Sequence, residues 1–210
     1  MKLNKRKLTP LQTATHIGAL IPLGLMLWDL FSNNFGPDPI REFTLRTGKS
    51  ALVLLLLSLA CTPTNAIFRL KQLLRLRRPL GLYSFFYASV HFAIFIGVDY
   101  FFNFNLIQDA LLDKRYAIVG LTTGLILLTL AITSTKGWQR RLKKNWKRLH
   151  KLAYAAGILA VIHYIWLVKP GVSQPWIFAA ILMFLYIFRV KSIQQWSKSA
   201  IGRITSLRAG

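Results

Sequence analysis

The segment most informative about architecture is KRLHKLAYAAGILAVIHYIWLVK, from Lys147 to Lys169. Its apolar part is long enough to cross a bilayer, and basic residues close it at both ends. The segment carries His150 near one end and His163 deep within it. Because polar side chains are costly inside a membrane and mark functional sites there, both histidines are candidate site residues.

Neutral imidazole is the commonest protein ligand for metals and a standard axial ligand of haem iron. On a single helix, His150 and His163 would lie about 20 Å apart at ~1.5 Å per residue, too far apart to bind one metal. Two stacked cofactors, or one cofactor and one unrelated histidine, fit that separation. At ~100° per residue the two side chains also lie on different helix faces. Both can therefore serve only with helix tilt or an irregular start near His150.

The rest of the chain has the same apolar character. Its 210 residues are 54% apolar and 13% aromatic, with a mean hydropathy of +0.42, and the apolar residues come in long blocks. Six stretches are predicted to span the membrane, at about residues 11–31, 49–68, 82–102, 117–135, 149–168 and 175–190. We therefore predict an all-α integral membrane protein, a six-helix bundle that forms one domain over residues 1–210. The first stretch lacks a small-residue cleavage site after it and is predicted to be a retained helix.

The net charge of +22 would suggest a nucleic-acid partner in a soluble protein, so its placement is decisive. If the connecting segments alternate between two sides, one side carries 22 of the 28 basic residues and no acidic residue. The other side carries six basic residues and all six acidic ones. The positive-inside rule then places both termini in the cytoplasm and makes the bilayer, not nucleic acid, the partner of this charge. The single cysteine, Cys61, excludes an internal disulfide framework and a cysteine-rich metal cluster.

His91 lies in the third stretch, which like the fifth runs outward from the basic side. At ~1.5 Å per residue, His91 and His163 lie roughly 14 and 21 Å from the inner boundary. Predicted helix ends shift by several residues, so these two depths overlap. Two histidines at one depth on different helices form the bis-histidine arrangement of a b-type haem, in a bundle interior where cofactor sites are built. The alternative is two independent histidines, each hydrogen-bonded to a Ser, Thr or Tyr.

Other features allow more than one interpretation. His16, in the first stretch, is either an interfacial histidine bonded to a neighbour or a cofactor ligand or propionate partner. The segment TSTKGWQRRLKKNWKRLHK binds either anionic lipid headgroups or a phosphate-bearing flavin or electron-donating protein. Gly120 and Gly124 form a GxxxG motif, which predicts close helix packing and no chemistry. The Leu-rich second stretch is expected to face lipid.

The sequence contains no Rossmann-type glycine fingerprint, P-loop, Ser-His-Asp order or zinc-ligand spacing. A haem protein without a nucleotide-binding domain must receive its electrons from another molecule.

Several motifs occur in order along nearly the whole chain: ATH around His16, TGKSAL, the TP of Thr62 and Pro63, RRPLGLYSFFYASVHF, TSTKGWQRRL, WKRLHKLAY and HYIWLVK. With these motifs the chain resembles the MsrQ (YedZ) family, the haem-binding inner-membrane subunit of the bacterial periplasmic methionine sulfoxide reductase system. That family belongs with the ferric reductase-like transmembrane domains.

The resemblance implies that His91, His150 and His163 are ligands of haem b iron. It implies that electrons pass from a cytoplasmic flavin reductase or the quinone pool to a periplasmic molybdopterin reductase, which repairs oxidised methionines. The chain would then be an electron-transfer subunit of the bacterial inner membrane, not the subunit that binds the final substrate. FMN binding is a further property that the resemblance leaves open, since no motif here tests it.

Arg78 departs from the wider superfamily, whose members typically carry two histidines on each of two helices. It stands 13 residues before His91, where a second histidine would be expected. His150 therefore has no histidine partner on the third stretch. His16 or a non-histidine group would have to serve, and Arg78 would pair with a haem propionate. The number of haems, one or two, stays open.

Two other functions compete with electron transfer to a periplasmic reductase. One is a stand-alone transmembrane ferric reductase. The other is a non-redox transporter or scaffold whose histidines relay protons. This last function has little support, because all six acidic residues fall on the outer side and no Asp or Glu chain crosses the core.

Overall fold

The computed structural model describes residues 9–169 and 171–189. Within these ranges it contains helices and no strand, which confirms the all-α prediction for this part of the chain. The elements in chain order are α1 (Pro10–Phe31), α2 (Pro39–Phe68), the 3-10 helix η1 (Lys71–Arg75), α3 (Arg77–Ile94), the π-helical turn η2 (Phe95–Asp99), α4 (Phe104–Asp113), α5 (Arg115–Ile132), α6 (Lys136–Leu149), α7 (Leu152–Leu167) and α8 (Gln174–Ile187).

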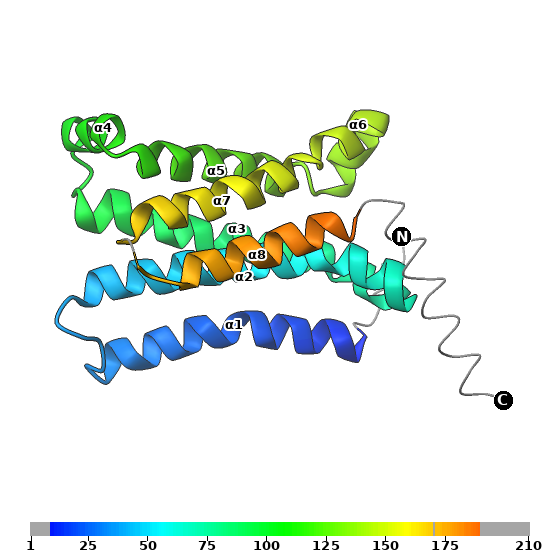
Figure 1. The fold of residues 1–210 in the computed structure, drawn as a ribbon, viewed down its shortest axis with the longest axis horizontal. Helices are drawn as coiled ribbons and strands as arrows, with labels where there is room; N and C mark the ends of the chain where they lie inside the picture. Colours follow the sequence, from blue (N-terminus) through cyan, green and yellow to red (C-terminus); the bar gives the residue numbers. More distant parts are fainter. Residues whose placement is uncertain (1–8, 170, 190–210) are drawn as a thin grey trace, which may run out of the picture.

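Two helical hairpins make the centre of the bundle (Figure 1). α2 packs along α3, and α5 packs along α7. Contacts between α3 and α5 join the two hairpins, while α1 lies against α2 and α3, and α8 against α7 and α2. The prediction that the second stretch faces lipid is wrong. α2 is a central helix with buried residues along its length. Its leucines belong to a cluster with residues of α3, α5, α7 and α8.

The two ends of the bundle carry different charged residues. The start of α1, the α2–α3 connection, α6 and the end of α8 lie at one end (Figure 1), which we call the basic end. The loop between α1 and α2, α4 and the connection between α7 and α8 lie at the other, acidic end. The acidic end carries Asp29, Asp38, Glu42, Asp99, Asp109 and Asp113. In the described part of the chain all acidic residues thus lie at one end, as expected from alternating connections, and which end faces the cytoplasm remains a prediction.

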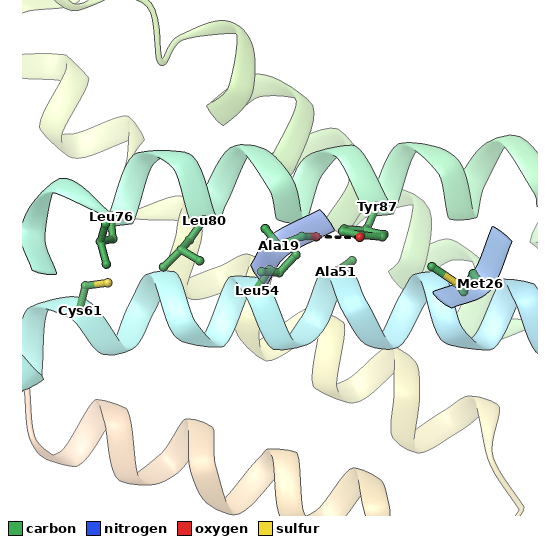
Figure 2. Close-up of a cluster of buried hydrophobic side chains, with 8 residues drawn as sticks. All are labelled: Ala19, Met26, Ala51, Leu54, Cys61, Leu76, Leu80 and Tyr87. Carbon is green, nitrogen blue, oxygen red and sulfur yellow. Dashed lines mark hydrogen bonds between the residues drawn. The ribbon is translucent and has the colours of Figure 1, made fainter. Parts of the chain in front are cut away.

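Tyr87 attaches α1 to the first hairpin. Its side chain is 0% exposed, and its hydroxyl donates to the Ala19 carbonyl at 2.7 Å (Figure 2). The same hydroxyl accepts the backbone N–H of Leu23 at 3.0 Å. In a regular helix this carbonyl and this amide pair with each other. The tyrosine hydroxyl therefore bonds to both members of one backbone pair of α1. This pair lies beside Pro22, which has no N–H to donate. α1 thus contains a proline in its interior, which membrane helices allow where neighbouring helices pack against them.

Buried side chains form two clusters that meet on α2. The first joins α1, α2 and α3 and consists of Ala19, Met26, Ala51, Leu54, Cys61, Leu76, Leu80 and Tyr87 (Figure 2). The second joins α2, α3, α5, α7 and α8 through Leu52, Leu55, Leu56, Leu59, Leu127, Ala156, Val161 and Leu182, with Phe85 packed at its edge.

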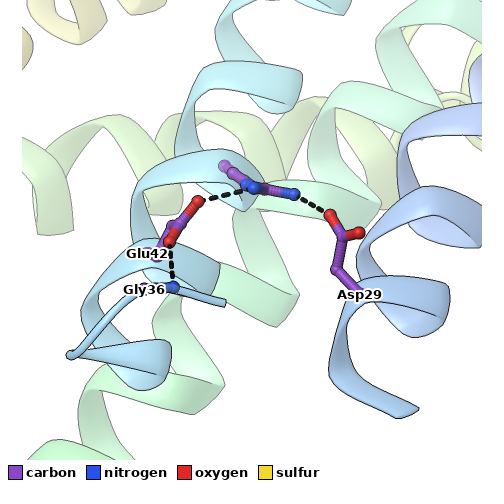
Figure 3. A network of polar contacts seen from close by, with 4 residues as sticks. Asp29, Gly36 and Glu42 are labelled. Atoms are coloured by element: carbon purple, nitrogen blue, oxygen red, sulfur yellow. Dashed lines mark hydrogen bonds and ion pairs between the residues drawn. The ribbon is translucent and has the colours of Figure 1, made fainter. Parts of the chain in front are cut away.

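Six helices, α1, α2, α3, α5, α7 and α8, lie on the predicted spans with shifts at their ends, and α4 and α6 lie outside these spans. α2 begins ten residues before the predicted start, at Pro39. This early part includes Arg46, which pairs with Asp29 of α1 and with Glu42 one turn earlier. Figure 3 shows Asp29 and Glu42 on either side of this pairing, with the backbone N–H of Gly36 donating to Glu42 at 3.0 Å. Because two carboxylates pair with Arg46, this charged residue can lie within the helix. Hydropathy counts the charge and not its partners, so it placed the start of the span after Arg46.

The count of spans is only partly supported. Four helices are long and apolar enough to cross a membrane: α1, α2, α3 continued through η2, and α5. α6 and α7 qualify together as a pair bent by 51°, and α8 is a shorter apolar helix of 14 residues. Among the described residues the structure therefore supports four or five spans, and the sixth remains a prediction.

The segment from Lys147 to Lys169 is not one helix, contrary to the simplest prediction. α6 ends at Leu149, α7 begins at Leu152, and His150 lies in the bend between them. Of the two alternatives that the spacing of the histidines left open, helix tilt or an irregular start near His150, the irregular start is present.

Candidate functional site

The structure brings His91 of α3 and His163 of α7 together. The centroids of their rings are 6.1 Å apart, and the ring planes are perpendicular, at 90°. We call these two residues the histidine pair. Both rings lie in the interior between the two hairpins, at the matching depth that the sequence suggested.

Each ring of the histidine pair is held by a backbone carbonyl of a neighbouring helix. Nδ1 of His91 lies 2.9 Å from the carbonyl oxygen of Thr44 in α2, and Nδ1 of His163 lies 2.7 Å from that of Tyr116 in α5. A carbonyl oxygen can only accept, so Nδ1 carries the proton and donates in both rings. Nε2 of each neutral ring is consequently a lone-pair donor, the state in which histidine binds a metal.

The spacing of the histidine pair suits two ligands on opposite sides of one metal. Imidazole nitrogens bind metals at about 2 Å, which leaves the centroids of two opposed rings about 6 Å apart. The observed separation is 6.1 Å. Among the described residues no group of three or more His, Cys, Asp or Glu side chains is close enough to hold a metal ion alone. The donor set therefore fits a metal whose other ligands belong to a cofactor, as in haem.

His150 is separate from the histidine pair. It caps the C-terminal end of α6 at the basic end, and its ring meets that of Trp146 edge-on with centroids 4.0 Å apart. Its Nε2 is buried and has no hydrogen-bond partner among the described residues. Thr62 Oγ1 and Asn65 Oδ1, in the last turns of α2 at the same end, are likewise buried and unpaired. An unpaired buried imidazole nitrogen calls for an explanation, and a second bound group is one.

His16 lies in a different environment. Its Nδ1 is 3.0 Å from the hydroxyl of Tyr83. This contact fits the first of the two alternatives given for His16, an interfacial histidine bonded to a neighbour. His16 and Tyr83 line a cavity of about 540 Å³ at the basic end, together with Arg75, Arg78 and Phe86. Arg78 thus faces the same cavity as His16, and neither is part of the histidine pair.

Comparisons with known proteins identify the family of this chain. The sequence model of the family described as "Ferric reductase like transmembrane component" matches residues 47–161. The protein-methionine-sulfoxide reductase heme-binding subunit MsrQ of Xanthomonas euvesicatoria pv. vesicatoria (strain 85-10) is 42% identical over 204 residues, which cover 94% of this chain and 91% of the relative. The chain belongs to the MsrQ family.

Other relatives support membership of the MsrQ family. The protein of the same name from Xanthomonas campestris pv. campestris (strain B100) is 42% identical over 201 residues, covering 93% of this chain and 90% of the relative. That of Rhodospirillum rubrum is 39% identical over 178 residues, covering 84% and 86%. Together with its apolar helices, this membership makes the chain a multi-pass membrane protein with a ferric reductase-like transmembrane domain.

Sequence reasoning did not anticipate the role of four residues beside the histidine pair: Thr44, Gly48, Tyr116 and Gly120. Thr44 and Tyr116 act through their carbonyls, which carry no signal in the sequence. The GxxxG interpretation is wrong in its details. A Cβ added to Gly124 would meet nothing within 4 Å, whereas one added to Gly120 would lie 2.8 Å from the ring of His163. Gly120 therefore makes room for an imidazole, whereas a side chain at Gly124 would meet nothing within 4 Å in the described part of the chain.

Proposed function

We propose that this protein is the haem b-binding electron-transfer subunit of a methionine sulfoxide reductase system of the bacterial inner membrane. In this proposal a cytoplasmic flavin reductase or the quinone pool supplies electrons at the basic end. A periplasmic molybdopterin-containing methionine sulfoxide reductase accepts them at the acidic end and repairs oxidised proteins. Six spans with both termini in the cytoplasm belong to the same proposal.

The observation that carries this proposal is the histidine pair. His91 and His163 would hold haem b, which supplies a one-electron carrier when bound. The chain contributes two neutral nitrogen ligands with protonated Nδ1 atoms fixed on carbonyls, so neither imidazole has to take up a charge in the membrane. The names of the relatives describe a heme-binding subunit.

The number of haems rests on His150. Its buried, unpaired Nε2 supports a second group near the basic end, with His150 as one ligand. His16 bonds to Tyr83 instead, which weakens its case as the partner ligand of His150. We propose haem b as the resident group at the histidine pair and a second haem as the reason for the unpaired nitrogen of His150.

The cavity beside His16 supports electron entry at the basic end. Its volume, about 540 Å³, falls in the range of small-molecule sites. Arg75 and Arg78 line it and offer guanidinium groups to a carbonyl, carboxylate or phosphate, while Leu20 and Phe86 provide apolar walls. A quinone and FMN each combine an apolar ring with carbonyl or phosphate oxygens, so either would fit this lining. A haem propionate would also pair with Arg78.

The test is the haem content of the purified full-length chain. We expect a b-type Soret band that shifts on reduction, and a pyridine haemochrome assay that gives one or two haems per chain. Ala in place of His91 or His163 should remove the haem of the histidine pair. This loss is most of the band if that haem is the only one, and about half of it if a second haem is bound near His150. Ser89→Ala is the matched control, because Ser89 is exposed on the same helix as His91 and bonds only within it. Folded protein without haem from haem-sufficient cells would refute the proposal.

A stand-alone ferric reductase is the second candidate function, favoured by the match to the ferric reductase-like family. Measuring iron reduction and methionine sulfoxide repair, with and without the periplasmic partner, separates the two. Repair that requires both proteins supports the electron-transfer subunit, and partner-independent iron reduction at a comparable rate supports the alternative.

A further inference from the structure

The two rings of the histidine pair are anchored in the same way. Each Nδ1 donates to a carbonyl 47 residues earlier in the chain, Thr44 for His91 and Tyr116 for His163. Each carbonyl is followed four residues later by a glycine, Gly48 or Gly120. The second anchor follows the first by 72 residues (44 to 116, 91 to 163), so the α2–α3 and α5–α7 hairpins repeat one local structure.

Each anchor consists of a backbone carbonyl, which every residue has, and a glycine. Only the glycine can be altered by substitution. A Cβ built on Gly48 would lie 3.1 Å from Nδ1 of His91, and one built on Gly120 would lie 2.8 Å from Nδ1 of His163. In each case the nearest atoms are those of the imidazole ring. No other glycine for which contacts are given places a Cβ against a histidine.

Helix geometry explains why the glycine stands four residues after the carbonyl. The carbonyl of residue i accepts the N–H of residue i+4 through one lone pair and has a second one free. Side chains on a helix point toward its N-terminus, so the Cβ of residue i+4 covers the turn that holds this carbonyl. Without a Cβ at i+4, an imidazole from the neighbouring helix can reach the second lone pair.

We propose that Gly48 and Gly120 are positioning residues for the histidine pair. Each leaves room for an imidazole to rest on the carbonyl one turn earlier, which fixes the protonated nitrogen as Nδ1, the ring orientation and the direction of Nε2. Hydrogen bonds from the far nitrogen of a metal-bound histidine set its tautomer and its strength as a ligand. This inference rests on the proposed haem site and adds to it which backbone positions control the ligands.

The two distances predict a graded effect. At 2.8 Å, a methyl group on Gly120 cannot be accommodated unless the ring of His163 moves. At 3.1 Å, a methyl group on Gly48 needs a displacement of only a few tenths of an ångström at His91. Gly120→Ala should therefore disturb ligation more than Gly48→Ala.

The experiment compares Gly48→Ala, Gly120→Ala and Gly124→Ala in the full-length chain with the wild type. Gly124→Ala is the matched control, because it adds the same methyl group to α5 where nothing lies within 4 Å. The readouts are hemin titration of haem-depleted protein, the spin state of ferric haem by electron paramagnetic resonance, and the midpoint potential. Size-exclusion elution and far-ultraviolet circular dichroism report whether each variant is folded.

We expect Gly120→Ala to bind haem about 10–100-fold more weakly, the usual effect of losing a partner of a metal-bound histidine. Its remaining haem should be partly five-coordinate and high-spin, and Gly48→Ala should remain low-spin with a shifted potential. Gly124→Ala should match the wild type. Folded Gly48→Ala and Gly120→Ala with wild-type affinity, spin state and potential would refute the inference and leave the haem site standing. If Gly120→Ala does not fold, the result for Gly48→Ala alone tests the positioning role of the glycines. A wild-type protein that binds no haem would overturn both this inference and the proposed haem site.

Discussion

Replacing Tyr87 with phenylalanine should loosen the attachment of α1 to the α2–α3 hairpin. Ala19 and Met26 are the buried residues of α1, so a few contacts hold this helix in place. The Tyr87 hydroxyl makes two of them, donating to Ala19 at 2.7 Å and accepting from Leu23 at 3.0 Å. Tyr87→Phe removes both hydrogen bonds and leaves the buried ring unchanged.

The expected loss of stability follows from the fate of the two backbone groups. Leaving a buried carbonyl or amide unpaired costs about 1–3 kcal/mol. The Ala19 carbonyl and the Leu23 amide can pair with each other as in any regular helix, so neither has to remain unpaired. What is lost is two hydrogen bonds between helices, which average about 0.6 kcal/mol and reach about 1.7 kcal/mol each in membrane proteins. We expect the free energy of unfolding to fall by about 1–2 kcal/mol.

Reversible unfolding in mixed micelles, with the fraction of denaturing detergent as the variable, measures this free energy. Tyr83→Phe is the matched control, because its hydroxyl lies one turn earlier on α3 and bonds to the side chain of His16 instead of the backbone of α1. It should lower the free energy of unfolding by less than Tyr87→Phe does. A Tyr87→Phe protein as stable as the wild type, or less affected than Tyr83→Phe, would show that the hydroxyl does not hold α1.

Three further predictions concern the ends of the bundle. Arg46→Gln should lower the free energy of unfolding by less than about 1 kcal/mol, since the side chain that pairs with Asp29 is 37% exposed, and the loss should shrink in high salt. Trp146→Phe removes the 2.8 Å hydrogen bond from Nε1 to the Thr133 carbonyl and should destabilise the α6 junction by about 1 kcal/mol, measured as faster cleavage of α6 by trypsin. Arg78→Gln should slow reduction by a quinol analogue or reduced flavin about tenfold, the effect of one charge-assisted hydrogen bond, without lowering haem content at the histidine pair.

The proximity of His91 and His163 could be predicted from the sequence, because the depth of a residue in a membrane helix follows from the number of residues between it and the helix end. Charge placement gives the direction of each helix, and the constant rise per residue gives the depth of each side chain. Errors of a few residues at helix ends shift both depths without separating them. Their role as haem ligands stays a prediction, which the spectroscopic test addresses.

The anchors of the two rings could not be predicted, because they depend on which helix faces which. GxxxG spacing shows that a helix surface is small, and it does not show what approaches that surface. Only the structure reveals that an imidazole lies over Gly120 and that no atom of the described residues lies within 4 Å of a Cβ built on Gly124. The start of α2 was misjudged for a related reason, since hydropathy counts the charge of Arg46 and not the carboxylates that pair with it.

The separation of the histidine pair depends on four helices. α3 and α7 carry the rings, while carbonyls of α2 and α5 hold them, so a displacement of α1 reaches the rings only by moving one of these four helices. Tyr87→Phe should therefore lower stability and leave the ferric spectrum and the haem content as in the wild type, although Tyr87 is one turn from His91. A shifted spectrum in that variant would show instead that α1 helps to set the ligand geometry and that the two hairpins do not form the site alone.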